Sequence, residues 1–586
     1  MLFLDWMKQI LAGFLFLCTA TLFGQQNPAM GKRDTLKYAH RTGGAIAEID
    51  HQNSFMGTTA PGGPFSRDEN TLPFDFFQTT YGGVKAYSFT QWNPMRFSGL
   101  PHLGFGYQFG SQATQYVHVR YTHAFTPKLL LNVDYDMIKA NGFMRNSTAA
   151  NHNVQIRLQR QSDFYSFSLK AQYLGRNSQY NDGLADTSLL GSLGLGFIQV
   201  NKADAQAKTK GARIELEHYF DFLKNDSINA TGIYVDNHLR VLNRRYREET
   251  FDMDSIYGGT GFFSSDSIAD QSQLSELITG AGLYYNRPNF YIKAGLQHNY
   301  WQYSNLGTLF RQSEVNVDAK LAYIGKKIEI TDHSNFNLVG ANREWFTHAK
   351  VVADFKSFKL NAALRLDNLL PEPFQRNYRG NYIQYNYALG DLKNQWKMQI
   401  DGAATYEKTN FSVKAFTGFA GMTNVYWYNN GAWAQDNNTA YNAFTVGGEF
   451  KGRFFNWLNV GAKAMYSSAN WMPDVFGRLR LAAGGKVLKG KKLYSQIGVE
   501  GTYLTEYDLI GFSPMFENYR YEQGMGISPS RWNLHVFGAL EVQTFRFFFR
   551  VENIGHIFQD SNMEVMKGYY ITPLHFRIGI TWDFFN

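Results

Sequence analysis

The feature that most limits how this chain can fold is a two-residue period of apolar and polar side chains that recurs from about residue 102 to the C-terminus. In residues 115–125, QYVHVRYTHAF, the apolar Val117, Val119 and Tyr121 alternate with His118 and Arg120. Such alternation is typical of a β-strand with one apolar and one polar face, and a helix would not produce it. The sequence predicts about 22 such strands, at residues 102–110, 115–125, 128–139, 152–159, 164–175, 211–222, 229–242, 276–285, 289–300, 311–323, 328–340, 347–356, 358–367, 394–404, 408–420, 440–450, 454–466, 474–485, 493–504, 532–542, 544–553 and 573–586.

The connections between these strands indicate how they are arranged. Counting back from the C-terminus, every second connection is a short turn, and most of the others are long, such as residues 505–531, 421–439 and 243–275. A transmembrane β-barrel has short periplasmic turns and long extracellular loops, whereas a soluble sandwich has no reason to separate them. We therefore expect an all-β fold, a transmembrane antiparallel β-barrel of about 22 strands, within a range of 18–24, over residues 102–586.

Composition agrees with this fold once the alternation is taken into account. The mean hydropathy of -0.36 would suit a soluble protein, but a strand with one face in lipid and one in water averages to a similar value. The net charge of +8 is modest for 586 residues, and its basic residues are scattered along strands, which excludes a nucleic-acid-binding surface. So many charged residues on one strand face would be costly in a filled core, so we expect a wide, wet lumen. The pore-lining candidates are Arg120, Lys170, Arg213, Glu215, Glu217, Asp401, Arg478, Arg480, Glu541, Arg546, Arg550 and Arg577.

The N-terminal residues differ from the rest. Lys8 and the apolar run at residues 10–24 predict a signal peptide over residues 1–24, with a retained anchor helix as the alternative. Cys18, the only cysteine, lies in that run, so a processed chain would form no disulfide. Residues 25–101 are rich in Gly, Pro and aromatic residues, and we expect them to lie below the barrel or to enter its lumen, partly plugging it.

The last strand resembles the terminal sorting strand of outer-membrane barrels, in which a polar residue is followed by glycine and two aromatics, here Arg577, Gly579, Trp582 and Phe584. This resemblance implies that the barrel assembly machinery recognises Gly579, Trp582 and Phe584. The mature chain as a whole resembles the putative porins of Bacteroidota, through a run such as residues 77–110 and the ending GITWDFFN. It implies a location in the outer membrane of a Gram-negative bacterium. Because the short turns face the periplasm, we also expect both termini to be periplasmic.

No catalytic or metal-binding motif is present, so we expect no enzyme, no cofactor and no metal site. His118 with Ser166 or Ser168 would be candidates for a hydrolase site, but scattered polar residues on a wet lumen face are the favoured explanation. The loop at residues 421–442 is a candidate contact for a sugar-like ligand, although packing of the loop on itself or an interfacial girdle explains it as well. Its candidate residues are Tyr426, Trp427, Tyr428 and Trp433.

The sequence therefore favours a porin-like channel for passive diffusion of small hydrophilic solutes, in contact with outer-membrane lipid. Two alternatives stay open. One is a gated or substrate-specific channel plugged by the N-terminal segment. The other is a non-transport barrel that serves as an adhesin or as the membrane part of a secretion or assembly complex. An energised receptor would need a plug domain larger than roughly 77 residues. Whether the chain forms a homo-oligomer is left open.

Overall fold

The computed structural model describes residues 89–586, with gaps at residues 91, 94–95, 97, 99, 163, 225–229, 250–260, 262–263, 265–266, 342, 388–390, 430–431, 437–439, 488–492, 521–523, 559–562 and 586. The predicted signal peptide with Cys18, and most of the predicted N-terminal segment, lie outside the described residues. No helix among the described residues is long and apolar enough to cross a membrane.

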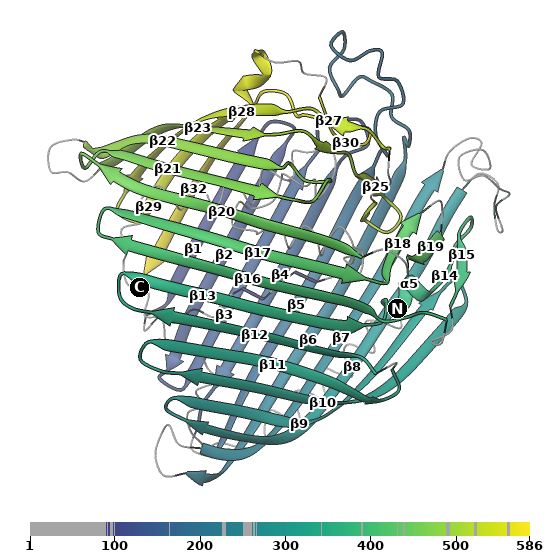
Figure 1. Cartoon of the computed structure of the whole chain (residues 1–586), viewed down its shortest axis with the longest axis vertical. Coiled ribbons are helices and arrows are strands. Elements are labelled where there is room, and N and C mark those ends of the chain that lie inside the picture. The colour runs from purple at the N-terminus through teal and green to yellow at the C-terminus, as the bar shows by residue number, and fades with distance from the viewer. Residues whose placement is uncertain are drawn as a thin grey trace.

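The described chain forms one closed antiparallel barrel of 22 strands, as the sequence predicts. The first strand pairs with both the second and the last, so each backbone ladder has a partner and no sheet edge is left open. Figure 1 shows the strands wrapping round the molecule. The barrel strands are β1 (His102–Gly110), β2 (Thr114–Thr126), β3 (Leu129–Ala140), β4 (Ala149–Arg160), β5 (Tyr165–Tyr180), β6 (Ala205–Lys224), β7 (Ala230–Glu249), β8 (Ser267–Arg287), β9 (Phe290–Asn305), β10 (Thr308–Ile324), β11 (Ile328–Val339), β12 (Trp345–Asp354), β13 (Phe358–Leu369), β16 (Gln395–Lys408), β17 (Phe411–Thr423), β20 (Tyr441–Phe454), β21 (Leu458–Ser467), β22 (Val475–Val487), β23 (Leu493–Leu504), β28 (Arg531–Val542), β29 (Phe545–Glu552) and β32 (His575–Phe585).

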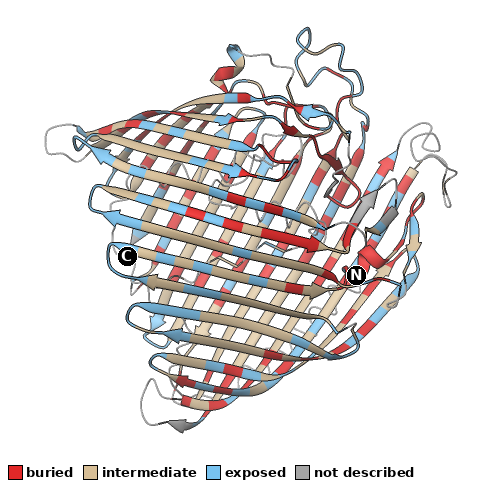
Figure 2. Ribbon diagram, in the orientation of Figure 1, coloured by how far each residue is buried: buried red, intermediate tan, exposed pale blue. Residues whose placement is uncertain are grey.

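Along the strands, apolar side chains face outward, where lipid would lie, and polar side chains face inward, toward the lumen. In β32, Phe576, Trp582 and Phe584 are exposed on the outer face, while Arg577 and Thr581 are buried on the inner face. Figure 2 shows the same alternation along most strands. Outward aromatic residues gather near both ends of the barrel, which is the girdle pattern of membrane-spanning barrels. One group includes Phe125, Phe222, Tyr323, Tyr406, Trp457 and Trp582, and the other includes Phe109, Phe336, Phe444, Tyr466, Tyr503 and Trp532.

The two ends of the barrel differ in their connections. At the turn end, where β1 begins and β32 ends, consecutive strands are joined by two to five residues. The long connections lie at the loop end, and there they contain the short elements α5 (Pro373–Arg376), β14 (Asn377–Arg379), β15 (Gln384–Asn386), β18 (Val425–Asn429), β19 (Ala432–Asp436), β24 (Tyr507–Asp508), β25 (Gly511–Ser513), β26 (Asn518–Arg520), β27 (Ile527–Ser528), η3 (Ile554–Ile557), β30 (Glu564–Met566) and β31 (Tyr569–Tyr570). Figure 1 shows α5, β25, β27 and β30 at this end. The segregation predicted from loop length is therefore present.

The wall is not equally long all round. Strands β6, β7 and β8 have 20, 20 and 21 residues, whereas β1 has 9 and β29 has 8. The sequence predicted shorter strands here, because near the loop end the inward residues of β6 to β8 include apolar ones such as Ala207, Leu242 and Ile268, which breaks the alternation. Loops predicted at residues 176–210 and 243–275 accordingly shrink to 181–204 and 250–266. The extra length of β6 to β8 extends this side of the barrel beyond the apolar band that faces lipid.

Candidate functional site: a charged lumen beneath a packed mouth

The inner face of the barrel carries all of the predicted pore-lining residues. Each alternates with outward apolar neighbours; Arg480, for example, lies between the exposed Leu479 and Leu481, and Asp401 follows the exposed Ile400. Asp401 accepts a 2.8 Å hydrogen bond from the Gln399 side chain. Their part in solute passage stays a prediction, but their placement makes the lumen wall polar and charged.

Five of the predicted pore-lining residues form a row of arginines near the closing strand that is extensively paired: Arg478, Arg480, Arg546, Arg550 and Arg577. Glu500 of β23 bridges Arg478 of β22 and Arg550 of β29, and the Arg550 contact measures 2.9 Å. Glu552 of β29 pairs with Arg550 at 3.1 Å and with Arg577 of β32 at 2.8 Å. Because carboxylates lie between the guanidinium groups, the row is a ladder of alternating charge and not a ring of positive charge.

The two remaining arginines of this row are also in contact with neighbours. Arg546 donates to Glu541 at 2.6 Å, across the pair β28 and β29. Arg480 lies over the ring of Phe537, with 4.4 Å between its guanidinium carbon and the ring centre, which is a cation–π geometry. Anion attraction by this row is therefore weaker than the sequence alone suggests.

A second charged group lies on the wall formed by β2 to β6. Asp134 of β3 lies 3.5 Å from Arg120 and 3.6 Å from Arg157. Lys170 of β5 contacts Glu215 at 3.0 Å and Glu217 at 3.7 Å. The remaining predicted residue of this wall, Arg213, lies 3.8 Å from Glu215. Opposite charges again alternate from strand to strand. Asp134 is almost fully buried among them, whereas Lys170 and Arg213 stay partly exposed to the lumen.

The described part of the N-terminal segment lies against this same wall. The Trp92 indole donates to Glu215 at 2.8 Å, and the Asn93 backbone NH donates to Gln155 at 2.8 Å. Arg96 pairs with Asp134, and Phe89 packs against the loop-end apolar cluster. These residues therefore cross the inner face from β6 to β2 before the chain enters β1. The other residues of the predicted segment, from 25 to 88, lie outside the described residues.

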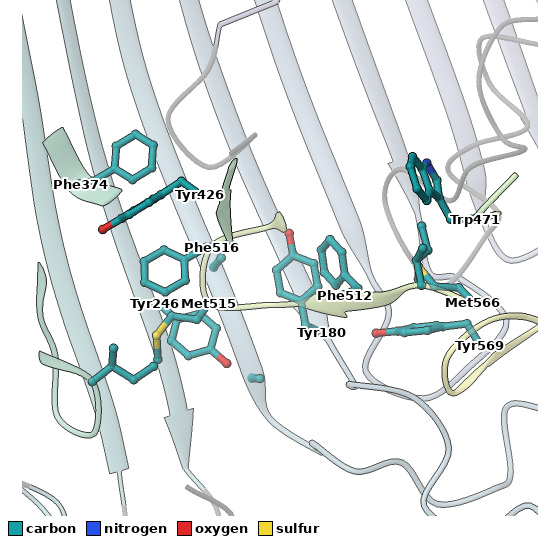
Figure 3. Packing of buried hydrophobic residues seen from close by; sticks show 14 of the residues in the cluster. Tyr180, Tyr246, Phe374, Tyr426, Trp471, Phe512, Met515, Phe516, Met566 and Tyr569 are labelled. Carbon is teal, nitrogen blue, oxygen red and sulfur yellow. The ribbon is translucent and has the colours of Figure 1, made fainter. Parts of the chain in front are cut away.

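The loop end is covered by a large apolar cluster, which we call the mouth cap. It joins buried side chains from the long loops to inward side chains of the strands below them. Figure 3 shows the packing, and Figure 2 shows buried residues concentrated at this end. Its larger members are Met144, Tyr180, Tyr246, Tyr303, Phe374, Tyr378, Met422, Tyr426, Trp471, Met472, Phe512, Met515, Phe516, Met566, Tyr569 and Tyr570. Aromatic and methionine side chains of this size supply most of the burial free energy of such a core.

One segment of the mouth cap crosses from one wall of the barrel to the other. The loop 505–530 leaves β23, which lies ten strand-to-strand steps from β7 in a ring of 22. Nevertheless Arg244 of β7 donates to the carbonyl of Pro514 at 3.3 Å, and lies 3.8 Å from Glu517. Phe512 lies beside Tyr180 of β5, with 5.6 Å between ring centres. Because β7 is nearly opposite β23, this loop spans the mouth.

Other loops hold the crossing segment from the sides. Phe516 packs edge-to-face on Tyr378, with ring centres 5.0 Å apart. The loops 181–204 and 553–574 meet through glycines: a Cβ on Gly183 would lie 2.7 Å from the Cα of Gly568, and both residues have positive φ. Only glycine allows this approach and this backbone conformation together. The mouth cap is thus built from several loops that depend on one another.

Glu344, in the connection between β11 and β12, links the mouth cap to the barrel wall. Its side chain accepts a hydrogen bond from the backbone NH of Leu370 at 2.6 Å, where the loop 370–394 begins. Burial, together with the neighbouring charge of Glu314, raises the pKa of Glu344 to about 7. This carboxyl group therefore changes charge near neutral pH, at a point where the mouth cap meets the barrel.

The predicted ligand-contact loop forms a hairpin of β18 and β19, in which Tyr428 and Trp433 are paired positions. Tyr426 is buried in the mouth cap and contacts Tyr387 edge-to-face, with 6.1 Å between ring centres. The side chains of Trp427, Tyr428 and Trp433 lie outside those described. Packing accounts for Tyr426, and ligand contact by this loop stays a prediction.

The residues predicted as an assembly signal lie on the closing strand. Trp582 and Phe584 stack on the outer face, with 4.4 Å between ring centres. A Cβ on Gly579 would lie 2.4 Å from the ring of Phe548, so glycine makes room for this inward ring. Recognition by assembly machinery stays a prediction. Among the described residues, no group of three His, Cys, Asp or Glu side chains is arranged to hold a metal ion.

Sequence reasoning missed the residues that organise the mouth. Glu500 could have been found, because it alternates with Ile497 and Val499 on an apolar-faced strand. Phe512, Phe516 and Glu344 could not, because loop residues have no periodicity that shows what they pack against. The wall contact of Trp92 likewise joins positions 123 residues apart in sequence.

A closed 22-strand barrel with an apolar outer band, aromatic girdles and a polar lumen defines the class of outer-membrane β-barrels. The sequence matches the family described as "Putative porin" over residues 86–586, and the chain belongs to this family. No curated protein matches the sequence significantly.

Solved outer-membrane barrels show the same fold at low sequence identity. The copper transporter OprC is 11% identical over 84% of this chain and 81% of its own, with a TM-score of 0.56. The siderophore receptor PirA from Acinetobacter baumannii is 11% identical over 84% and 81%, with a TM-score of 0.55. The FrpB iron transporter from Neisseria meningitidis is 10% identical over 83% and 81%, with a TM-score of 0.54. At these identities the likeness concerns the fold.

Proposed function

We propose that this protein is a gated outer-membrane channel for small hydrophilic solutes, with its loop end facing outside and the mouth cap acting as the gate. The single observation that carries this proposal is the loop 505–530, which runs from β23 to contacts on β7 across the mouth. A barrel that served passive diffusion alone would have no need for a packed apolar core at its entrance. In this proposal the mouth cap is the gate, whereas the sequence-based alternative is a gated or substrate-specific channel plugged by the N-terminal segment.

The lumen wall supports hydrophilic cargo without strong selection by charge. Its acidic and basic groups alternate, as in the contacts of Lys170 with Glu215 and Glu217, whose side chains stay partly exposed. Fixed, paired charges offer hydrogen-bonding sites to water and polar solutes while producing little net potential. Of the three similar structures, two are transporters and one is a siderophore receptor, which also favours passage of a solute over a purely structural role.

A cross-link across the mouth tests this function directly. The chain has one cysteine, Cys18, within the predicted signal peptide, so introduced cysteines would be the only thiols of a processed chain. The double variant Tyr180→Cys/Phe512→Cys joins the crossing loop to β5, where the two rings lie 5.6 Å apart. We expect a cleavable bis-maleimide to abolish conductance in a planar bilayer, and reduction of the linker to restore it.

Both single-cysteine variants, treated in the same way, serve as controls and should conduct before and after reduction. Equal conductance of the cross-linked and reduced double variant would contradict gating by the mouth cap. Silence of the wild-type protein in the bilayer and in liposome-swelling assays, with an intact barrel, would instead favour the adhesin or assembly role.

A further inference from the structure

The outer face of β6 and β7 carries a basic patch that the channel does not use. Lys208 and Lys210 of β6 and Arg245 of β7 point outward and are exposed. We call these three residues the β6–β7 basic patch. None of them makes an ion pair with any residue that the structure describes. They therefore have no part in the paired charges of the lumen or in the mouth cap.

The strand register places like charges directly opposite one another. Lys208 is the antiparallel partner of Arg245, and Lys210 is the partner of Asn243. Directly opposed side chains on one face lie about 5 Å apart at Cβ, and like charges there destabilise a sheet. The neighbours in the same row are Asn177 on β5 and Gln271 on β8, which are amides and not acids. An anion from outside the chain would offset this repulsion.

Acidic residues do not neutralise the patch from its own face. Glu249, the described outward acid on β7, is already paired with Arg247. Asp204 lies beside Glu249, beyond the loop end of the patch. Both acids thus lie farther from the membrane than Lys208 and Arg245, and Glu249 already forms an ion pair.

The patch lies just above the band that faces lipid. Tyr173, an exposed aromatic residue of β5, is the partner of Ala212, two residues from Lys210 and four from Lys208. The next outward row contains Ile214 and Leu239, followed by the exposed Leu277. At a rise of about 3.3 Å per residue and a strand tilt of about 40°, the two lysines lie about 5 and 10 Å above Ala212. That is the depth of lipid headgroups.

We propose that the β6–β7 basic patch binds the phosphate groups of lipid headgroups in the leaflet that surrounds the loop end. Lysine and arginine near a membrane surface attract anionic headgroups, and amide side chains beside them donate hydrogen bonds to phosphate oxygens. The site does not depend on which solute the channel passes. It would fix the height of the long wall formed by β6 to β8 relative to the membrane.

The double variant Lys208→Gln/Arg245→Gln tests the site in the full chain. Native mass spectrometry in detergent would measure binding of monophosphorylated lipid A and of dephosphorylated lipid A. We expect the wild type to prefer the phosphorylated lipid. Removal of two charges should weaken its binding about 30-fold, which at 1.4 kcal/mol per tenfold is about 2 kcal/mol. The variant Lys208→Arg/Arg245→Lys keeps both charges and should retain the preference.

Three outcomes would overturn the proposal. The first is equal affinity of the double variant and the wild type for the phosphorylated lipid. The second is an equal loss in the matched control Lys326→Gln/Lys327→Gln, whose exposed lysines lie at the turn end between β10 and β11. The third is full competition by inorganic phosphate at millimolar concentration, which would indicate a site for free anions. Heat-modifiable migration in gels confirms that each variant is folded.

Discussion

At the mouth of the barrel, apolar side chains from distant loops pack against one another, whereas along the lumen charged side chains of neighbouring strands pair. The two regions share the same walls, since β5 and β7 supply both Tyr180 and Tyr246 to the mouth cap and Lys170 and Arg240 to the lumen. The mouth cap is stabilised by burial of apolar surface, which needs every loop in place at once. The lumen charges lie on strands that are held together by backbone hydrogen bonds, and closure of the barrel does not depend on these charges. Changes in the mouth cap should therefore alter opening, and changes in the lumen should alter selection.

The largest effect is expected from removing the crossing segment. Replacement of residues 510–517 by a short Gly-Ser linker removes Phe512, Met515 and Phe516 from the mouth cap, together with the Pro514 carbonyl that Arg244 binds. We expect single-channel conductance to rise several-fold while the barrel remains folded. A Gly-Ser linker in place of residues 191–194, which are exposed at the same end, should leave conductance unchanged. An unchanged conductance in the first variant would show that the crossing loop does not restrict the mouth.

A single cavity in the mouth cap should loosen it without opening it fully. Phe516 is 0% exposed, so Phe516→Ala removes a whole ring from the cluster and should cost about 3–5 kcal/mol of its local stability. Hydrogen exchange of the loop 505–530 should become faster, and the open probability should increase. Phe197 is 80% exposed, so Phe197→Ala is the matched control and should change neither measurement. Equal exchange in both variants would contradict a cooperative mouth cap.

The lumen should respond in charge selection and not in opening. Glu500→Gln removes the carboxylate between Arg478 and Arg550, and an uncompensated buried charge costs about 3 kcal/mol, less where water reaches it. The reversal potential in a salt gradient should shift toward anions, while open probability stays as in the wild type. Glu407→Gln removes an exposed, paired carboxylate at the turn end and should shift neither quantity. A change in open probability with Glu500→Gln would break the separation between the two regions.

The smallest expected effect is a pH dependence at the junction of the mouth cap and the wall. Burial raises the pKa of Glu344 from 4.5 to about 7, so the proton binds more tightly in the closed structure. Its stabilising contribution is complete below about pH 4.5, falls as pH rises, and is lost above about pH 7. At 1.36 kcal/mol per pKa unit the upper limit is about 3 kcal/mol, which water around this partly exposed group reduces. Open probability should therefore increase between pH 5 and 8.

Glu344→Gln keeps a hydrogen-bond acceptor for Leu370 but cannot ionise, so its open probability should not change over this pH range. Retention of the full pH dependence in this variant would assign the effect to another group.

The strand pattern was readable from sequence because each barrel residue has only two environments. An apolar residue such as Val117 suits the lipid side and a charged residue such as Arg120 suits the water side, and this period of two is repeated from strand to strand. The pattern failed most near the loop ends of β6 to β8, where both faces leave the lipid and inward residues such as Leu242 pack against the mouth cap. The pairing of Glu500 with Arg478 and Arg550 was not readable from the sequence, because pairing across strands depends on register.

The sequence by itself determined the number of strands to within a few, the direction of most barrel side chains and the end at which the long loops lie, since these follow from local alternation and chain length. Only the tertiary structure decided that the loop 505–530 crosses to β7, that Glu500 separates two arginines, and that Lys208 faces Arg245. These contacts depend on ring closure and strand register, which bring together residues as far apart as Arg244 and Pro514, and no local pattern of amino acids encodes that distance.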